Sequence, residues 1–388
     1  MIKELSPQAR VAVSTSDPKL WSNDSYFRGK DITFIPQAWD FQKESSWFQK
    51  KIIPLSKYAF SIMREIFLCH LAAKFAPYSL IINPAFLQYA EGSDIIISVG
   101  GHHFTTLLSR DLVSSINYDA MAACLCKKKL YAFSQSFGPF NFYNPRNRRL
   151  TKKLLTSFDG LYARERGSVE ELRSMDVPPS KIHEVPETVF SIASYIQSYT
   201  LPSKREKILG ISIYSTVRRN GEERASYVNT ISTVIRYAAM QGYGVLLFPM
   251  ELKDSEPDDR PLLADIRRSA NVAECKLVDR DLSTEEHLEA VSKCRIFIGH
   301  KTHSVIFSIV TGTPLIAIAY HPKTREFMRQ LSQQEDCIND SQLTGELLIS
   351  MFKDLEARAD ATGKKYRNKA LELGISVKRA FKKILSLQ

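Results

Sequence analysis

The segment 295–325 constrains the fold more than any other part of this chain. An apolar strand is predicted at Arg295–Ile298, a helix at Ser304–Thr311 and a second apolar strand at Pro314–Ala319. A helix that connects two apolar strands is typical of a parallel sheet with helices on its faces. Each strand ends in a run of cationic and proton-transferring side chains. Because ligands bind outside the carboxyl ends of strands in open α/β sheets, both runs are candidate binding segments.

The alternation of strands and helices extends through most of the 388 residues and predicts an α/β protein with doubly wound, parallel sheets. In the first half, strands are predicted at 10–14, 31–35, 94–99, 130–134 and 160–164, and helices at 56–75, 111–126, 144–157 and 167–175. In the second half, strands are predicted at 208–214, 244–249, 275–278, 295–298 and 314–319, and helices at 225–241, 258–269, 283–293, 304–311 and 324–331. Glu286 lies three residues after Ser283, which is a capping-box pattern for a helix start.

Two domains of ordinary size fit this length. The polar run 201–207 is predicted to be a linker, so the N-terminal domain is expected over 1–200 and the C-terminal domain over 208–340. Residues 341–388 are predicted to form terminal helices, interrupted at Gly363 and Gly374. One arrangement open to these helices is packing against the N-terminal domain.

The composition argues against several classes of protein. The six cysteines show no metal-ligand spacing, so reduced, mostly buried thiols in a cytosolic protein are expected. Lys3 and Glu4 interrupt any apolar leader, and prolines break the weakly polar stretch 75–90, which is too short to span a bilayer. We therefore expect a cytoplasmic location.

The net charge of +11 arises largely near the C-terminus, where residues 352–388 contain ten Lys or Arg and four Asp or Glu residues. Two interpretations remain open. The charge belongs either to a solvated helical face or to a surface that attracts an acidic glycan or the inner face of the membrane, as a peripheral contact. Nucleic acid is not expected as a partner, because no known binding motif accompanies the basic residues.

The turn 299–303 has the chemistry of an anion site that contains a histidine. It follows a strand, opens a helix, and contains His300, Lys301 and His303. The first turn of a helix offers free backbone N–H groups and a favourable dipole to an anion. The next strand ends in 320–325, which adds Lys323 and Arg325.

These segments resemble the polysaccharide pyruvyl transferase family. The family's Gly-x-Arg-x-His-Ser, Gly-x-Pro and Tyr-x-Pro-Lys motifs correspond here to 299–304, 312–314 and 320–323. Upstream, Ser98-Val99-Gly100-Gly101 follows a strand, 135–139 is similar to the family's Gln-Ser-x-Gly-Pro motif, and 164–168 is similar to its Arg-Glu-x-x-Ser motif. The resemblance covers roughly residues 94–335, with the motifs in the family's order.

The resemblance implies two Rossmann-like domains that face each other across a cleft, as in the GT-B-like glycosyltransferase architecture. It also implies transfer of the enolpyruvyl group of phosphoenolpyruvate to two hydroxyls of a sugar in a surface polysaccharide or its precursor. The product is a pyruvate ketal. Phosphoenolpyruvate would be the donor substrate and no cofactor would be needed, while the acceptor would be a sugar or oligosaccharide, with a lipid-linked form among the candidates.

The resemblance also implies roles for individual residues on the donor side. His303 is the candidate for proton transfer, since a reference pKa near 6.5 suits either direction. The phosphoenolpyruvate site would include Lys301, Thr302 and His303, together with Lys323 and one or both of Arg218 and Arg219. Arg218 and Arg219 follow the first strand of the second domain, where the family has a donor-binding arginine.

On the acceptor side, the resemblance implies contacts from five residues: Gly100, Gly101, His102, Gln135 and Ser136. The pair His102 and His103 does not predict a metal site, because adjacent histidines rarely converge on one ion and no carboxylate set accompanies them. Arg164 and Glu165 fit either a catalytic role or a structural ion pair, and the sequence leaves both open.

Three departures from the family pattern bear on function. Lys301 replaces an arginine and cannot make the planar two-point contact with phosphate. The usual Asn-x-Gly-Asp opening motif is absent, and Glu187 replaces an aspartate after Pro186. Two alternatives therefore stay open: a nucleotide-sugar glycosyltransferase of the same architecture, and a catalytically silent relative that binds glycans.

Overall fold

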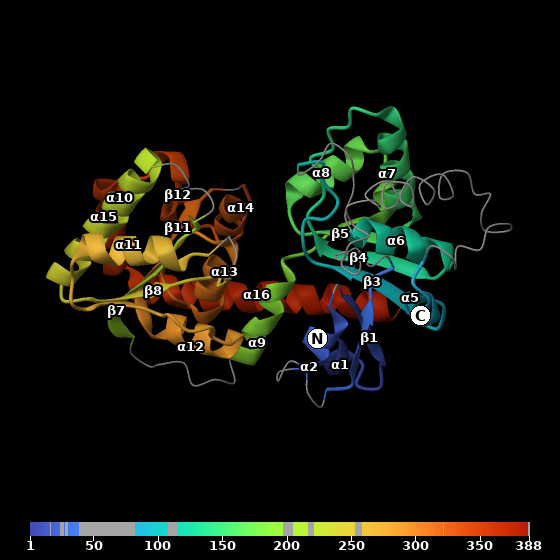
Figure 1. Cartoon of the computed structure of the whole chain (residues 1–388), viewed down its shortest axis with the longest axis horizontal. Coiled ribbons are helices and arrows are strands. Elements are labelled where there is room, and N and C mark those ends of the chain that lie inside the picture. The colour runs from blue at the N-terminus through green and yellow to red at the C-terminus, as the bar shows by residue number, and fades with distance from the viewer. Residues whose placement is uncertain are drawn as a thin grey trace, which may run out of the picture. The chain divides into compact units, whose positions relative to one another are not determined.

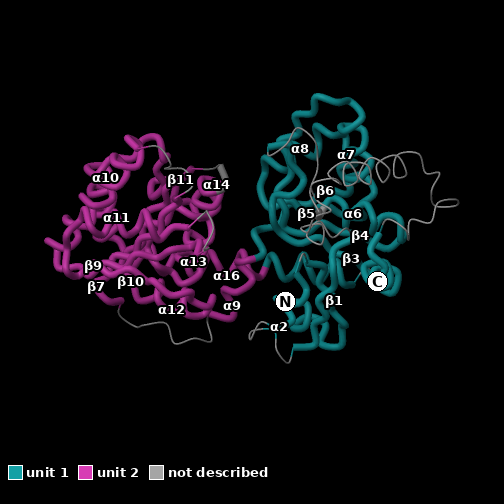
Figure 2. Tube along the Cα trace, in the orientation of Figure 1, with its two compact units in different colours: residues 1–188, 376–388 teal, residues 189–375 magenta. Residues whose placement is uncertain are grey.

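The computed structural model describes residues 1–15, 17–23, 27, 30–38, 82–107, 115–196, 205–215, 221–252, 258–320 and 322–386. By its internal contacts the chain divides into two units, residues 1–188 with 376–388, and residues 189–375 (Figure 2). The division therefore falls between Thr188 and Val189, ahead of the polar run 201–207. The predicted helix at 56–75 lies outside the described residues.

Among its described residues, unit 1 contains two parallel sheets, one of four strands in the order β3-β4-β5-β6 and one of two strands, β1-β2. Its strands are β1 (Val11–Thr15), β2 (Ile32–Pro36), β3 (Ile95–Val99), β4 (Lys129–Gln135), β5 (Gly160–Ala163) and β6 (Ile182–Glu184). Its helices are α1 (Ile2–Leu5), α2 (Pro18–Asn23), α5 (Pro84–Glu91), α6 (Ser115–Leu125), α7 (Pro145–Ser157) and α8 (Arg166–Ser174).

Residues on β4 alternate between the two faces of the larger sheet in unit 1. Leu130 and Ala132 join a core with residues of α6, α7 and α8. Tyr131 and Phe133 face the other way, and pack with Phe381 and neighbouring apolar residues in the last turns of α16 (Ala359–Leu385). Alternate residues of β4 are therefore buried on opposite faces of the sheet, and the end of α16 covers part of one face.

The described part of unit 2 contains a six-stranded parallel sheet in the order β12-β11-β10-β7-β8-β9. Its strands are β7 (Glu206–Ser212), β8 (Gly244–Phe248), β9 (Cys275–Leu277), β10 (Cys294–Gly299), β11 (Leu315–Ala319) and β12 (Cys337–Asn339). Its helices are α9 (Ala193–Ile196), α10 (Gly221–Met240), α11 (Arg260–Ala270), α12 (Thr284–Lys293), α13 (Thr302–Thr311), α14 (Pro322–Gln330), α15 (Gly345–Ala357) and the first part of α16 (Figure 1).

Helices cover both faces of the unit 2 sheet. The core on one face includes residues of α10, α11 and α15, and the core on the other includes residues of α9, α12, α13, α14 and α16. From β7 the chain adds β8 and β9 on one side, and it then returns to add β10, β11 and β12 on the other side. The strand order therefore reverses between β7 and β10, and this switch point is where open α/β sheets bind ligands.

The predicted breaks at Gly363 and Gly374 are wrong, since α16 continues through both residues. A Cβ atom at Gly363 would lie 2.5 Å from the carbonyl oxygen of Gly312, and one at Gly374 would lie 2.5 Å from that of Phe190. Both glycines therefore allow the helix backbone to pack closely against other backbone segments of unit 2. The capping box at the start of α12, between Ser283 and Glu286, is confirmed.

Candidate functional site

The turn after β10 lies at the switch point of unit 2. Gly299 pairs with Ser212, the last residue of β7, and the His300 amide donates a hydrogen bond to the Ser212 carbonyl at 3.1 Å. Lys301 is the N-cap of α13 and its side chain makes no capping hydrogen bond. The first N–H groups of α13 thus begin beside the carboxyl end of β7, which is the geometry of an anion-binding helix terminus.

Lys301 is buried in this turn and paired with two carboxylates. Its Nζ atom lies 2.8 Å from Oε2 of Glu251 and 3.1 Å from Oδ2 of Asp259. The same atom lies 5.2 Å from the centroid of the Tyr214 ring, within the range of a cation–π contact. Lys301 thus connects the ends of β10 and β8 across the end of β7.

Asp259 anchors this cluster from the start of α11. Its carboxylate is wholly buried and accepts hydrogen bonds from the amides of Met250 and Glu251, each at 3.0 Å, and from the amide of Ser215 at 3.3 Å. These donors follow β8 and β7. Sequence reasoning missed Asp259 and Glu251, although Glu251 stands just after a predicted strand, a position that could have marked it.

His300 is also buried and is held by polar groups on both sides of its ring. Its Nδ1 lies 3.0 Å from the Tyr227 hydroxyl, and its Nε2 lies 3.4 Å from Oδ1 of Asp340. The Tyr320 ring stacks edge-on to it at 5.5 Å. Burial raises the pKa of Tyr320, and a hydrogen bond with the Thr302 side chain offsets part of that rise. The contacts of His300 with Tyr227 and Asp340 therefore hold this turn on its buried side.

The predicted donor-side residues fall into three groups. His303 stands exposed in the first turn of α13, and Thr302 beside it is half-buried. Lys301 is buried, as described above. Lys323 is the second residue of α14, while Arg218 and Arg219 lie outside the described residues. The structure therefore brings Lys301, Thr302 and His303 together on one turn.

The predicted acceptor-side residues lie in unit 1, at the carboxyl ends of β3 and β4. Gly100 and Gly101 have φ values of 63° and 81°, and a Cβ atom at Gly101 would overlap the His103 ring. An Nε2 atom of His102 contacts the Gly138 carbonyl oxygen. This turn therefore depends on glycine for its left-handed backbone.

Gln135 and Ser136 are buried beneath that turn. The side-chain amide of Gln135 donates a hydrogen bond to the Ser98 hydroxyl at 2.5 Å. The Ser136 hydroxyl accepts one from Nε of Arg164 at 2.8 Å. The Ser136 amide donates to the Gly101 carbonyl at 3.1 Å. Both residues thus support the Gly100–Gly101 turn from inside unit 1.

Of the two roles left open for Arg164, the structure shows the ion pair. Arg164 contacts Glu187 through Nη1, and its Nε lies 3.4 Å from Glu165. Glu187 also contacts the Ser134 hydroxyl, at 3.5 Å. The segments 134–136, 164–165 and 187 are therefore joined in one buried polar network at the strand ends.

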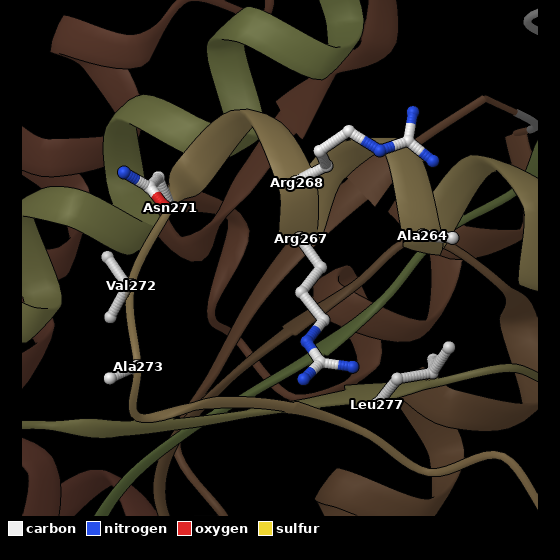
Figure 3. Close-up of a pocket in the computed structure, with 7 residues that line it drawn as sticks. All are labelled: Ala264, Arg267, Arg268, Asn271, Val272, Ala273 and Leu277. Atoms are coloured by element: carbon white, nitrogen blue, oxygen red, sulfur yellow. The ribbon is translucent and has the colours of Figure 1, made fainter.

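No group of three or more His, Cys, Asp or Glu side chains that could hold a metal ion occurs within the described ranges. A hollow of about 550 Å³ lies beside the C-terminal end of α11 and the edge strand β9, lined partly by Arg267 and Arg268 (Figure 3). None of its lining residues belongs to the turn after β10.

Within the part of the chain that the structure describes, no helix combines the length and the apolar character that a membrane span requires.

Comparison with known proteins decides the family. Residues 2–322 match the sequence model of the polysaccharide pyruvyl transferase family. The chain belongs to this family. The amylovoran biosynthesis protein AmsJ of Erwinia amylovora is 24% identical over 257 residues, covering 62% of this chain. The match spans 60% of the length of that relative.

The fold of this polysaccharide pyruvyl transferase family member is shared with sugar-nucleotide enzymes. A UDP-N-acetylglucosamine 2-epimerase aligns with a TM-score of 0.60 at 12% identity, covering 99% of this chain and 90% of the enzyme. The Neisseria meningitidis UDP-GlcNAc 2-epimerase, solved with UDP-GlcNAc, aligns with a TM-score of 0.57 at 13% identity, covering 97% and 99%. These likenesses confirm the prediction of two Rossmann-like units of the GT-B-like type.

Proposed function

We propose that this family member transfers the enolpyruvyl group of phosphoenolpyruvate to two hydroxyls of a sugar in a surface polysaccharide or its precursor. The observation that carries the proposal is the turn 299–304, which corresponds to the family's motif, with lysine in place of arginine at 301, and lies at the switch point of unit 2. An exposed histidine and the N–H groups of a helix's first turn at this point suit a small, highly charged donor.

The chemistry requires one proton for C3 and the removal of one proton from each of two sugar hydroxyls. C3 of the enol accepts a proton, and C2 becomes electrophilic. One sugar hydroxyl adds to C2, phosphate leaves, and the second hydroxyl closes the cyclic ketal. Of the two hydroxyl protons, one balances the proton taken up by C3 and the other leaves on the phosphate, so the overall products are the ketal and inorganic phosphate. In the proposal His303 donates the proton to C3 or removes one from a hydroxyl, a role that typically gives ~10²–10⁴-fold in rate.

The remaining proposed roles follow charge and position. The phosphate and carboxylate of the donor would be bound by cationic side chains. These are Lys301, Lys323 and one or both of Arg218 and Arg219. Gly100, Gly101 and His102 would contact the acceptor, with Gln135 and Ser136 supporting their turn.

Thermal unfolding with and without ligands tests the donor. A ligand at 100 times its Kd should add about 2.7 kcal/mol of stability. Stabilisation by phosphoenolpyruvate, but not by UDP-sugars, supports the proposal. A response to UDP-sugars alone would favour a glycosyltransferase, and no response to either would favour a silent glycan-binding relative. Release of phosphate from phosphoenolpyruvate in the presence of candidate acceptors then tests the reaction itself.

A further inference from the structure

The Lys301 ammonium is buried and ion-paired, but it makes no well-directed hydrogen bond among the residues described. Its residue is only 7% exposed, at the N-cap of a ten-residue helix. Although Glu251 lies 2.8 Å away, neither Nζ of Lys301 nor Oε2 of Glu251 has a well-directed hydrogen bond within the described ranges. A buried polar group without such a bond is costly, so a better-directed acceptor at this place would be favoured.

A second buried polar group without a hydrogen bond in the described part of the chain is the Ser212 hydroxyl, at the carboxyl end of β7. The Ser212 hydroxyl is fully buried and has no hydrogen-bond partner among the residues described. Ser212 pairs with Gly299, and a Cβ atom at Gly299 would point at Ser304 and Val305 of α13. Paired residues of parallel strands share a face, so Ser212 faces the first turns of α13.

The two carboxylates beside Lys301 are not equivalent. Asp259 is wholly buried and accepts hydrogen bonds from three backbone N–H groups. If its carboxylate moved away, these N–H groups would lose their acceptor. The Glu251 side chain is 33% exposed and no hydrogen bond among the described residues holds its Oε2 atom, so Glu251 is the partner that can turn toward water. Lys301 therefore has one fixed partner and one exchangeable partner.

We propose that Glu251 occupies, in the ligand-free protein, the place of the donor's phosphate group on Lys301. The inference rests on the proposed function, since it takes the phosphate of the donor as the ligand. One ammonium and two carboxylates leave a net negative charge at this point, which opposes an entering phosphate. When phosphate binds, Glu251 rotates outward, Asp259 keeps its contact, and the helix N–H groups of α13 complete the subsite.

Removing the competing carboxylate should tighten anion binding. From the usual strength of a partly exposed ion pair, Glu251→Gln should lower the Kd for inorganic phosphate by about two- to fivefold. Glu251→Asp keeps the charge but withdraws it by one methylene, and should give a smaller gain. Glu286→Gln is the matched control, because it makes the same charge change at a capping position where glutamine also serves.

Calorimetric titration of the full-length wild type and the three variants with inorganic phosphate, and separately with phosphoenolpyruvate, tests the proposal. Tighter phosphate binding in both Glu251 variants, with Glu286→Gln unchanged, is the expected result. Equal or weaker binding in both Glu251 variants, an equal gain in the control, or no phosphate binding by any of the proteins overturns it. Phosphate binding that follows the expected order without any binding of phosphoenolpyruvate would overturn the proposed function and leave the subsite standing.

Discussion

Nζ of Lys301 lies 3.1 Å from an Asp259 carboxylate that has no exposed surface. Strands β8 and β10 flank β7, so this contact extends across the end of the middle strand. Parallel strands lie about 4.8 Å apart, so the ends of β8 and β10 are roughly 9.6 Å apart, a distance that the Lys301 side chain and the Asp259 carboxylate bridge together. The pair therefore fastens the three strand ends around which the candidate donor site is built.

Loss of the Asp259 carboxylate should destabilise unit 2. Asp259→Ala leaves Lys301 with one partly exposed partner and three backbone amides without their acceptor, so we expect a loss of about 3–5 kcal/mol. Urea unfolding followed by circular dichroism measures the change. Asp265→Asn on the same helix removes a partly exposed partner of Arg224 and should cost less than about 1 kcal/mol. Equal midpoints for the two variants would contradict the anchoring role.

The Arg164–Glu187 pair in unit 1 should behave as a buried ion pair. Arg164→Ala leaves the Glu187 carboxylate, whose side chain is 7% exposed, without its cation, and we expect a loss of about 3–5 kcal/mol. Replacing both residues with apolar ones, Arg164→Met with Glu187→Leu, should cost less than Arg164→Ala alone. Thermal unfolding of both proteins measures this difference. A double variant less stable than the single one would show that the hydrogen bonds to Ser134 and Ser136 matter more than the charges.

Asp119 should make unit 1 less stable as the pH rises. Burial raises the pKa of Asp119 from 3.8 to about 6, although the Ala38 amide and the Ser14 hydroxyl donate hydrogen bonds to its carboxyl group. The folded state therefore binds the proton more tightly than the unfolded state. Its contribution to stability is complete below about pH 4 and is lost as the pH rises through 6, by ~3 kcal/mol at most.

Asp119→Asn removes this titration while keeping an oxygen for the Ala38 amide. The stability of the variant relative to the wild type should therefore increase from about pH 4 to about pH 7. Urea unfolding at both pH values measures the difference. A constant difference across this range would mean that Asp119 titrates at its ordinary pKa.

Local patterns predicted most described elements, because strand and helix periods reflect burial that each element has by itself. Ser283 and Glu286 marked the start of α12, and the apolar runs marked all the strands of unit 2 except β12. Local patterns gave a wrong prediction at Gly363, which was expected to break a helix but lies inside α16. Its role depends on the Gly312 carbonyl, about fifty residues earlier in the chain, and local propensity carries no information about that contact.

The candidate site shows the same limit. The motif 299–304 identified the turn, but it did not reveal that Lys301 would be buried against Glu251 and Asp259. That contact depends on β8 and β10 lying on opposite sides of β7, and strand order was not predicted from the sequence. A motif can identify residues expected to contact ligands. The side chains that pair with those residues and set the net charge of the site are brought there by the strand order.

Replacement of His303 should abolish transfer without unfolding the protein. The residue is exposed on α13, so His303→Ala should change stability by less than about 0.5 kcal/mol, whereas loss of proton transfer should lower kcat by ~10²–10⁴-fold. Phosphate release from phosphoenolpyruvate measures turnover, and thermal unfolding measures the fold. His303→Gln retains a polar side chain that cannot exchange a proton at neutral pH, so it should be as inactive as the alanine variant. Turnover retained by His303→Gln would show that this histidine positions a substrate and that another group transfers the proton.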